Sequence, residues 1–499
     1  MSDLQSTVEQ WAALNPQQLC IIEAETGCAL SYAQYLSAFY AMRRHIGARP
    51  RHIALALPGG IISATVWISV LTGGHTLIPL SPDATAQEKA RIGQLYQPDI
   101  LIVEQAAEAR DFNCPGATVI TRQQCEQLIQ QASYSLDDNH ERMTSGAGSV
   151  ILHTSGSTGK PKGVLLQVSQ IAWTAEHISA NHRLSPQDRG LTVLPFFHVN
   201  APVVSLCASL MTGSTVVIAQ RFSRRHFWQW IEDYQITWAS IVPTILAIML
   251  ETEKPAFLPG SLRFVRTASA PLPASQMEAF EAKFGLPVIE TYGLSEAASQ
   301  VTANPVQPAI HKAGSVGLPV GLSLRICQPL SEKGDEAWMD VEPGAAGEIC
   351  ISGPSVIEGY LDNADERSFR DRWFRTGDIG YLDSDGYLFI TGRLREVINR
   401  GGENIAPREI EEVLLTHPLV SDAAVVGRPD PIYGEVVVAY IVTQSKGGPE
   451  MQQRLHRYAA ERLSSAKVPV DYVIVSALPR TTSGKVARQV LREQELHHG

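Results

Sequence analysis

Short apolar runs alternate with longer amphipathic segments along most of the chain. The runs IALALP, TVVIAQ and RFVRTAS are rich in residues that favour strands, whereas RRHFWQWIEDYQ and SQMEAFEAKFG carry apolar residues at helical spacing. Parallel strands need a crossover connection, and that connection is usually a helix. The alternation therefore predicts an α/β fold in which helices cover mainly parallel sheets.

The pattern changes twice towards the C-terminus. Between residues 345 and 392 the apolar runs are short and separated by turn signals, which indicates a small antiparallel β subdomain. Beyond Arg393 a glycine-rich turn leads to a helical pattern, which is followed by two strands and another helix. We predict a large N-terminal domain over residues 1–394, the β subdomain included, and a smaller C-terminal α/β domain over residues 395–499.

Length, charge and cysteine usage narrow the class of protein. The chain has 499 residues, which exceeds what one hydrophobic core usually supports, and a formal net charge of −10. A negatively charged chain without Lys/Arg runs is a poor match to nucleic acid, so no nucleic-acid partner is expected. The seven cysteines form no CxxC or other metal-ligand spacing, and we expect them to be reduced residues of the core.

The start of the chain and its most apolar segment argue against export and membrane insertion. The opening MSDLQSTVEQWAALNP lacks a basic region followed by an apolar core, so no secretory signal is expected. The apolar stretch 53–80 contains Pro58 and paired glycines, which fits a strand, loop, helix and strand better than a membrane span. We expect a cytoplasmic protein with no membrane span.

A dense cluster of hydroxyl, glycine and lysine residues follows the apolar run SVILH. It reads TSGSTGKPKG from Thr154 to Gly163 and leads into a second apolar run. Glycines permit close approach of the backbone to a phosphate, and hydroxyl and ammonium groups donate to phosphate oxygens. The glycine spacing and Pro161 differ from the Walker loop, which continues directly into a helix. A plain surface turn is the alternative, but two lysines beside so many hydroxyls favour a polyphosphate site.

This loop resembles the signature loop of the adenylate-forming superfamily, which comprises acyl-CoA synthetases, adenylation domains and luciferases. Six further segments, in the same order as in the family, extend the resemblance from about residue 30 to the C-terminus. They are PFFHVN (195–200), SAPLP (269–273), TYGLSE (291–296), FRTGD (374–378), GRLREVINRGGEN (392–404) and RTTSGK (480–485). The resemblance implies a mobile C-terminal domain and an enzyme that joins a carboxylic acid first to AMP and then to a thiol.

The resemblance also implies which residues bind the nucleotide. It places Glu296 on Mg2+, gives adenine the face of Tyr292, and gives the ribose hydroxyls Asp378 with Arg393. Taken alone, the tyrosine would be a core residue and the aspartate a helix cap or surface residue, so these roles depend on the order of the motifs. The implied ATP and AMP set is Thr154, Ser155, Gly156, Ser157, Thr158, Gly159, Lys162, Ala270, Pro271, Tyr292, Gly293, Ser295, Asp378 and Arg393.

The implied catalytic residue is Lys485, which lies in a Ser-Gly-Lys turn close to the C-terminus. In the family this lysine bridges the carboxylate and the α-phosphate while negative charge redistributes. The carboxylate displaces pyrophosphate from ATP, and a thiol then displaces AMP. Relatives rotate the C-terminal domain between these steps about a hinge residue, here Arg395, which brings Gly401 and Gly402 to the site as a tunnel for coenzyme A. A structural turn is the alternative role for this glycine pair.

The motifs say less about the identity of the carboxylic acid substrate than about the nucleotide. His198 resembles the gate of the acyl pocket and is a candidate for contact with the reacting carboxylate, which adds it to the catalytic set. Asn200 and Trp238 are candidates to line the same pocket, with core packing as the alternative for each. The chain looks closest to small and medium-chain acyl-CoA synthetases, including oxalyl-CoA-synthetase-like members. No cationic residue for a second carboxylate is identifiable by position, so the sequence names no acid.

The expected cofactors and substrates are ATP, Mg2+, CoA and a small carboxylic acid. Two alternatives stay open: transfer of the acyl group to an amine or to a carrier-protein phosphopantetheine, and a catalytically silent nucleotide-binding protein on the same fold. The presence of Lys485, Glu296 and Asp378 disfavours the second. A homodimer is compatible with the chain, since apolar surface is not separable from apolar core in a sequence. Regulation of the lysine by acetylation is equally open.

Overall fold

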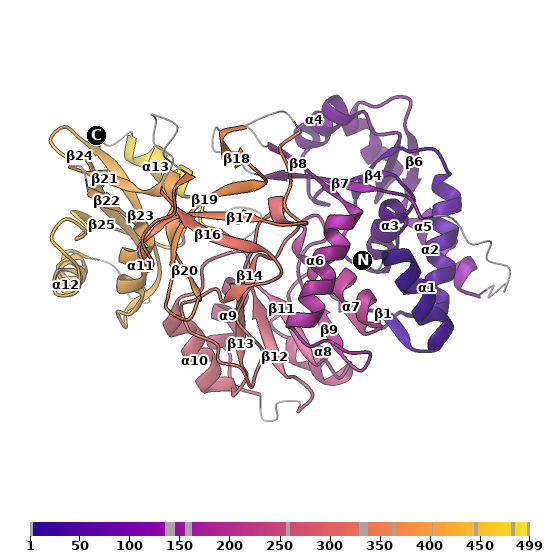
Figure 1. Cartoon of the computed structure of the whole chain (residues 1–499), viewed down its shortest axis with the longest axis horizontal. Helices are drawn as coiled ribbons and strands as arrows, with labels where there is room; N and C mark the ends of the chain where they lie inside the picture. Colours follow the sequence, from indigo (N-terminus) through magenta and orange to yellow (C-terminus); the bar gives the residue numbers. More distant parts are fainter. Residues whose placement is uncertain are drawn as a thin grey trace.

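In the computed structural model, a large N-terminal part adjoins a smaller C-terminal part, drawn in orange and yellow in Figure 1. The described residues are 3–134, 145–154, 162–255, 260–328, 338–361, 366–401, 403–443, 448–480 and 485–496. Across these ranges the strands form four sheets, and two of them make up most of the large part.

The two sheets of the large part are mainly parallel. The nine-stranded sheet has the order β15 (Leu318–Pro319), β14 (Thr302–Ala303), β13 (Val288–Tyr292), β12 (Phe264–Thr267), β11 (Trp238–Ile241), β9 (Arg189–Thr192), β10 (Thr215–Ile218), β1 (Leu19–Glu23) and β2 (Ala29–Ser31). The six-stranded sheet has the order β6 (Thr118–Thr121), β5 (Ile100–Val103), β3 (His52–Ala56), β4 (Thr76–Pro79), β7 (Ser149–Thr154) and β8 (Lys162–Gln167). The antiparallel pairs are β1–β2, β13–β14, β14–β15 and β7–β8. The predicted sheet class is confirmed.

Helix α3 (Ile61–Thr72) lies between these sheets. It contacts β1 of one sheet and both β4 and β7 of the other, and all twelve of its residues are buried. A helix that is apolar on all sides needs such a double contact, because each face must be covered. The predicted strand, loop, helix and strand of residues 53–80 are therefore β3, α3 and β4, and the segment belongs to the core.

The other helices of the large part pack on the sheets, on α3 or on one another. Local sequence sets where some of them start. Helix α2 begins after Ser31, whose hydroxyl accepts a hydrogen bond from the backbone N–H of Gln34, and the side-chain oxygen of Gln34 accepts one from the backbone N–H of Ser31. These helices are α1 (Leu4–Leu14), α2 (Tyr32–Ile46), α4 (Ala86–Tyr96), α5 (Arg122–Tyr134), α6 (Val168–Asn181), α7 (Ala208–Thr212), α8 (Phe227–Asp233), α9 (Pro243–Leu250) and α10 (Ala274–Phe284). A π-helix, η2 (Ala201–Cys207), immediately precedes α7.

A small antiparallel sheet follows, as predicted, but it begins earlier than the turn signals suggested. Its strands are β16 (Ser323–Cys327), β17 (Gly347–Ser352), β18 (Phe369–Arg370), β19 (Trp373–Leu382) and β20 (Leu388–Arg393). The first strand was missed because its burial does not alternate but increases from the exposed Ser323 to the buried Cys327, and only the pairing with β17 identifies these residues as a strand.

The C-terminal part has a sheet and cores of its own. The sheet has the order β22 (Glu403–Ile405), β21 (Ile398–Arg400), β24 (Gly434–Thr443) and β23 (Val420–Asp430), with β25 (Asp471–Val475) also paired to β24. Helices α11 (Pro407–Leu415), α12 (Pro449–Ala460) and α13 (Arg488–Leu496) complete this part. The last fully buried residue of the N-terminal core is Leu388, and the first of the next core is Ile398. The domain boundary predicted at residue 394 lies in this interval and stays a prediction.

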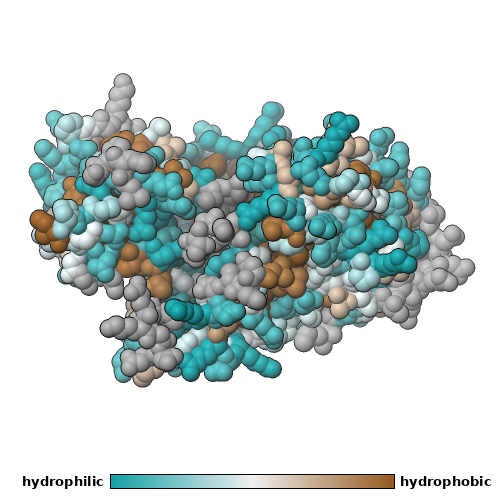
Figure 2. All heavy atoms as spheres, turned by 90° about the horizontal axis from the view of Figure 1, so that it is seen from above, coloured by the Kyte–Doolittle hydropathy of each residue, from teal (hydrophilic) through white to brown (hydrophobic). Residues whose placement is uncertain are grey.

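The protein has a mainly polar face (Figure 2), and most of its cysteines are buried. Figure 2 shows a mainly hydrophilic face with small, separate apolar patches. Among the helices of the described ranges, none combines the length and hydropathy that a membrane crossing requires. All seven cysteines are free thiols. Five are buried as expected, but Cys28 is exposed and Cys114 is partly exposed, because both lie in connections outside the sheets.

Candidate functional site

A cavity of about 840 Å³ opens at the carboxyl ends of four adjacent parallel strands. Segments that leave β9, β11, β12 and β13 line one side of it, and the β subdomain and the start of the C-terminal part line the other. Ligands of open α/β sheets bind in this position, because the connections that leave the strand ends diverge there. The fold alone therefore marks this cavity as the candidate site.

The turn after β13 carries a buried carboxylate into the cavity. Glu296 is 8% exposed, and its Oε1 accepts from the hydroxyl of Tyr360 at 2.9 Å. Burial raises the pKa of this carboxyl group, and the Tyr360 hydrogen bond opposes the rise. The turn requires Gly293, because a Cβ there would lie 1.4 Å from the carbonyl oxygen of Ser299. Gly293, Ser295 and Glu296 all line the cavity, as the sequence predicted.

A cross-strand ion pair lies beside this carboxylate. Asp378 and Arg393 are opposite each other on β19 and β20, and Arg393 Nε lies 2.9 Å from Asp378 Oδ1. The hydroxyl of Tyr292 donates to Asp378 Oδ2 at 2.6 Å. Burial raises the pKa of Tyr292, and the charge of Asp378 raises the pKa of Arg393. Asp378 and Arg393 line the cavity together, and a carboxylate beside a guanidinium can receive the vicinal hydroxyls of a ribose.

Three predicted base-binding residues are not part of the cavity lining, and their role stays a prediction. Tyr292 is not part of the cavity lining and instead fixes Asp378 through its hydroxyl. The turn after β12 reaches the cavity with Ala268 and Ser269, whereas Ala270 and Pro271 lie beyond it. The backbone of Ser269 has a φ of 75°, and this reversal carries the next two residues away from the lining.

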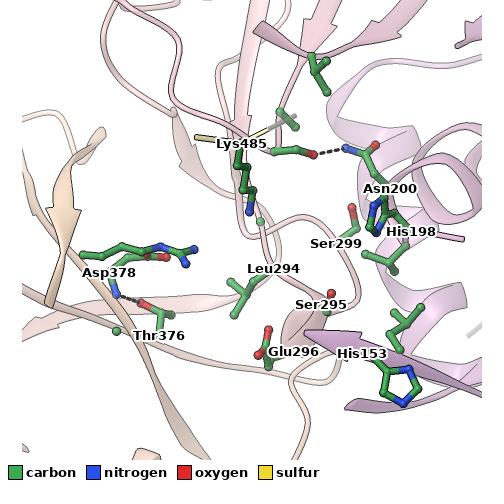
Figure 3. A pocket seen from close by; sticks show the side chains of 18 of the residues that line it. His153, His198, Asn200, Leu294, Ser295, Glu296, Ser299, Thr376, Asp378 and Lys485 are labelled. Atoms are coloured by element: carbon green, nitrogen blue, oxygen red, sulfur yellow. Dashed lines mark hydrogen bonds and ion pairs between the residues drawn. The ribbon is translucent and has the colours of Figure 1, made fainter. Parts of the chain in front are cut away.

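The predicted catalytic lysine reaches the cavity from the C-terminal part. Figure 3 shows Lys485 extending between Asp378 on one side and His198 with Asn200 on the other. Burial by the surrounding walls and the nearby Arg393 lower the pKa of Lys485, whereas Asp378 and Glu296 raise it. A backbone bridge joins Arg480 to Val486, the residue that follows the lysine.

The predicted hinge and tunnel residues occupy different positions. Arg395 lines the cavity, and its carbonyl accepts from Arg492 of α13 at 3.0 Å, so this helix is anchored at the junction of the two parts. Gly401 lies in the exposed β21–β22 turn with a φ of 60° and is not part of the lining. Gly402 lies outside the described residues. In this conformation Lys485 lines the cavity and Gly401 does not.

The signature loop is described only at its two ends. Thr154 is the last residue of β7, and Lys162 is the first of β8. Lys162 lines the cavity, with its ammonium 4.7 Å from the centre of the Tyr360 ring. The other predicted phosphate-binding residues of the loop, Ser155, Gly156, Ser157, Thr158 and Gly159, lie outside the described residues.

The predicted acyl-pocket residues are brought together with one exception. His198 and Asn200 line the cavity just before η2, and π-helices are frequent at functional sites. Burial, and then Lys485, lower the pKa of His198 to about 4, so its imidazole is neutral at pH 7. Trp238 is wrong as a pocket residue. It is fully buried and packs on Phe264 and His182, because its side chain projects into the core from β11.

Arg266 on β12 is among the lining residues that sequence reasoning missed. The residue is 1% exposed and donates to Asn200 Oδ1 at 3.3 Å, Ser240 Oγ at 3.5 Å and Gln300 Oε1 at 3.3 Å. Burial lowers its pKa to about 9, which leaves it protonated at pH 7. The available signal was an arginine inside an otherwise apolar strand, RFVRTAS, where a charge is rarely placed without a function.

The charges of the lining favour a polyanionic ligand. The described lining residues include six cations and three carboxylates. The cations are Lys162, Arg266, Arg375, Arg393, Arg395 and Lys485, and the carboxylates are Glu296, Glu348 and Asp378.

In the described part of the chain, no group of three His, Cys, Asp or Glu residues is placed to hold a metal ion by itself. Mg2+ is usually held by one or two carboxylates together with substrate phosphates, so the carboxylate of Glu296, which is hydrogen-bonded to the Tyr360 hydroxyl, fits a metal ion that arrives with a nucleotide.

Comparison with known proteins gives two matches to family models. The model of the AMP-binding enzymes matches residues 8–361, and that of the AMP-binding enzyme C-terminal domain matches residues 409–485. The chain is 43% identical to a sulfoacetate–CoA ligase of Cupriavidus necator over 345 residues, which span 68% of this chain and 66% of that protein. It is 35% identical to an oxalate–CoA ligase of Arabidopsis thaliana over 89% of this chain and 88% of that protein.

A solved structure extends the similarity to the whole chain. The o-succinylbenzoate CoA synthetase of Bacillus subtilis, in complex with its acyl-adenylate intermediate, superposes with a TM-score of 0.84 at 28% identity. The superposition covers 99% of each chain. The large and small parts described above therefore correspond to those of a protein whose structure holds an acyl-adenylate.

Proposed function

This chain belongs to the family of AMP-binding enzymes, and on that premise we propose that it is an ATP-dependent carboxylic acid–CoA ligase that works through an acyl-adenylate. In the first half-reaction a carboxylate oxygen attacks the α-phosphorus of ATP, the bond to the β-phosphate breaks, and pyrophosphate leaves. In the second, the thiol of coenzyme A attacks the acyl carbon, and AMP leaves as the thioester forms. Relatives named sulfoacetate–CoA and oxalate–CoA ligases support coenzyme A as the acceptor.

The observation that carries this proposal is the position of Lys485 in the same cavity as Glu296 and Asp378. During displacement, negative charge moves from the attacking carboxylate to the phosphate oxygens, and a fixed ammonium stabilises it most where water is excluded. The walls that lower the pKa of Lys485 also exclude water from its amine. We assign this lysine the stabilisation of the transition state for adenylate formation.

The neighbouring residues hold the nucleotide in this assignment. Asp378 accepts from the ribose hydroxyls and Arg393 keeps its carboxylate oriented. Glu296 would hold Mg2+, which neutralises the phosphates of the bound nucleotide. His198 is neutral and next to Lys485, so its imidazole orients the reacting carboxylate by hydrogen bonding without competing for its charge.

The positions of Lys485 and Gly401 suit the first half-reaction. Lys485 lies inside the cavity and Gly401 outside it. We propose that the C-terminal part turns about Arg395 before the thiol attacks, so that the lysine leaves and the β21–β22 turn replaces it.

The free thiols indicate the cellular compartment of the protein. All seven cysteines are unpaired, which fits a reducing compartment, and we propose that the protein is cytoplasmic.

The direct test measures AMP and pyrophosphate release from Mg-ATP with a panel of acids, with and without coenzyme A, and identifies products by mass. An acyl-CoA whose formation matches AMP release supports the ligase. An acyl-adenylate that forms but is not converted to acyl-CoA would indicate that the acceptor is an amine or a carrier protein. Absence of pyrophosphate release with every acid, while ATP still binds, would leave a silent nucleotide-binding protein.

A further inference from the structure

We infer that the acid carries a second anionic group, a carboxylate or a sulfonate, and that Arg266 receives it within the cavity. The inference rests on the proposed function, because it names the class of acid that the ligase activates. Three features carry it: the missing counter-ion of Arg266, its place in the lining, and its relation to Lys485.

Arg266 is a buried cation whose hydrogen-bond acceptors are all neutral. Its three acceptors are the side-chain oxygens of Asn200, Ser240 and Gln300, at 3.3 to 3.5 Å. Among the residues that the structure describes, no carboxylate lies within 4.0 Å of its guanidinium, and its Nε has no hydrogen-bond partner. The side-chain nitrogen of Gln300 is also a buried donor without a partner among these residues. An anion would satisfy two donors that the protein leaves unsatisfied.

A second buried arginine of the lining, Arg375, shows how a charge in the same cavity is compensated. Arg375 is 2% exposed, and its Nε donates to Glu348 Oε2 at 2.8 Å. Burying a charge is unfavourable unless a partner compensates it, so an uncompensated arginine persists where a ligand supplies the opposite charge. Arg266 and Arg375 both line the cavity, and of these two only Arg266 faces it without a carboxylate.

The second anion and the reacting carboxylate would occupy opposite ends of a short segment. Asn200 accepts from Arg266, while His198, two residues earlier, is close enough to Lys485 for the ammonium to lower its pKa. Two residues span about 7 Å at most. An acid held between Arg266 and Lys485 along this segment therefore has its two anionic groups separated by few carbons.

The first test compares matched acids in the wild-type enzyme by acyl-CoA formation. Oxalate is paired with oxamate and malonate with malonamate, so that a neutral amide replaces only the second carboxylate, and sulfoacetate is paired with acetate. We expect a preference of about 10²-fold or more in kcat/KM for the dianionic member. The carboxylate and sulfonate arms identify which anion Arg266 accepts. Equal kcat/KM within every pair overturns the inference and leaves the ligase in place, whereas no product with any acid overturns the proposed function as well.

The second test changes the arginine itself. We expect Arg266→Met to abolish the preference through a higher KM for the dianionic acids, with the KM for ATP unchanged, and Arg266→Lys to restore part of it. Arg263→Met is the matched control, because Arg263 borders the same strand, pairs with Asp188 and is outside the lining. A loss of activity that is equal for both members of each pair would show that Arg266 only supports the fold.

Discussion

At one wall of the cavity each buried carboxylate has a cationic or hydroxyl partner, whereas at the opposite wall a buried arginine has only neutral ones. The first, the carboxylate wall, comprises Glu296, Glu348 and Asp378, which contact Tyr360, Arg375 and Arg393. The second, the Arg266 wall, comprises His198, Asn200 and Arg266. The difference separates two uses of charge. Pairs within the protein fix geometry, and an unpaired charge marks a place where the ligand completes the pair.

Lys485 lies between the two walls, and its removal should have the largest effect. We expect Lys485→Ala to reduce pyrophosphate release by about 10³-fold, because a single preorganised donor to a developing charge contributes that much. ATP binding, measured by calorimetry, should persist. Lys467→Ala, which removes a surface lysine paired with Glu409 in the same part of the chain, is the control. Unchanged turnover in the Lys485 variant would contradict its assignment.

Stability measurements sharpen the contrast between the walls. Glu348→Ala leaves Arg375 buried without its partner and should lower the free energy of unfolding by about 3–5 kcal/mol. Arg266→Met removes a charge that is already uncompensated, so the variant should stay within about 1 kcal/mol of wild type or become more stable. Urea denaturation of both variants measures the difference. Equal destabilisation would mean that Arg266 is compensated within the fold and would remove the distinction.

A substitution in the carboxylate wall should impair the use of ATP without changing the choice of acid. Asp378→Asn keeps the shape of the side chain but removes the charge that holds Arg393, so kcat/KM for ATP should fall by about 10- to 100-fold. The ratio of kcat/KM between paired acids should not change, because Arg266 is untouched. Asp383→Asn, at a surface aspartate paired with Lys312, is the control. A change in acid selectivity would show that the two walls are coupled.

The carboxylate wall could be predicted from sequence better than the Arg266 wall. Asp378 and Arg393 belong to motifs that resemble family motifs, and hairpin pairing places them opposite each other. Arg266 lies in a run that predicts an ordinary buried strand, and its acceptor Asn200 is 66 positions away in the chain. Which neighbours a buried arginine meets is decided by tertiary packing, and local periodicity carries no information about it.

The prediction for Trp238 failed for a related reason. Every residue of β11 is buried, so the sequence gives no alternation that would distinguish the cavity face from the core face. The element type was predictable from composition, but the direction of the side chain was not. The adenine-stacking role of Tyr292 stays a prediction, because the hydrogen bond from its hydroxyl to Asp378 does not involve the faces of the ring.

The last expected effect concerns Glu290, a buried carboxyl group on β13. Burial raises its pKa to about 7, since Arg408 opposes this rise only in part, Glu412 adds to it, and its Oε2 has no partner among the described residues.

The unfolded chain releases this proton near pH 4.5, so between about pH 4.5 and 7 the folded state binds the extra proton. Its contribution to stability is therefore present in full below pH 4.5 and is lost as the pH rises through 7. We expect the wild type to lose up to about 1.4 kcal/mol per pH unit across this window relative to Glu290→Gln, which cannot titrate. Urea denaturation at about pH 5, 6, 7 and 8 measures the difference, with the exposed Glu278→Gln as the control. Parallel stability curves for wild type and the Glu290→Gln variant would mean that a counter-charge such as Arg408 compensates this carboxylate in the folded state.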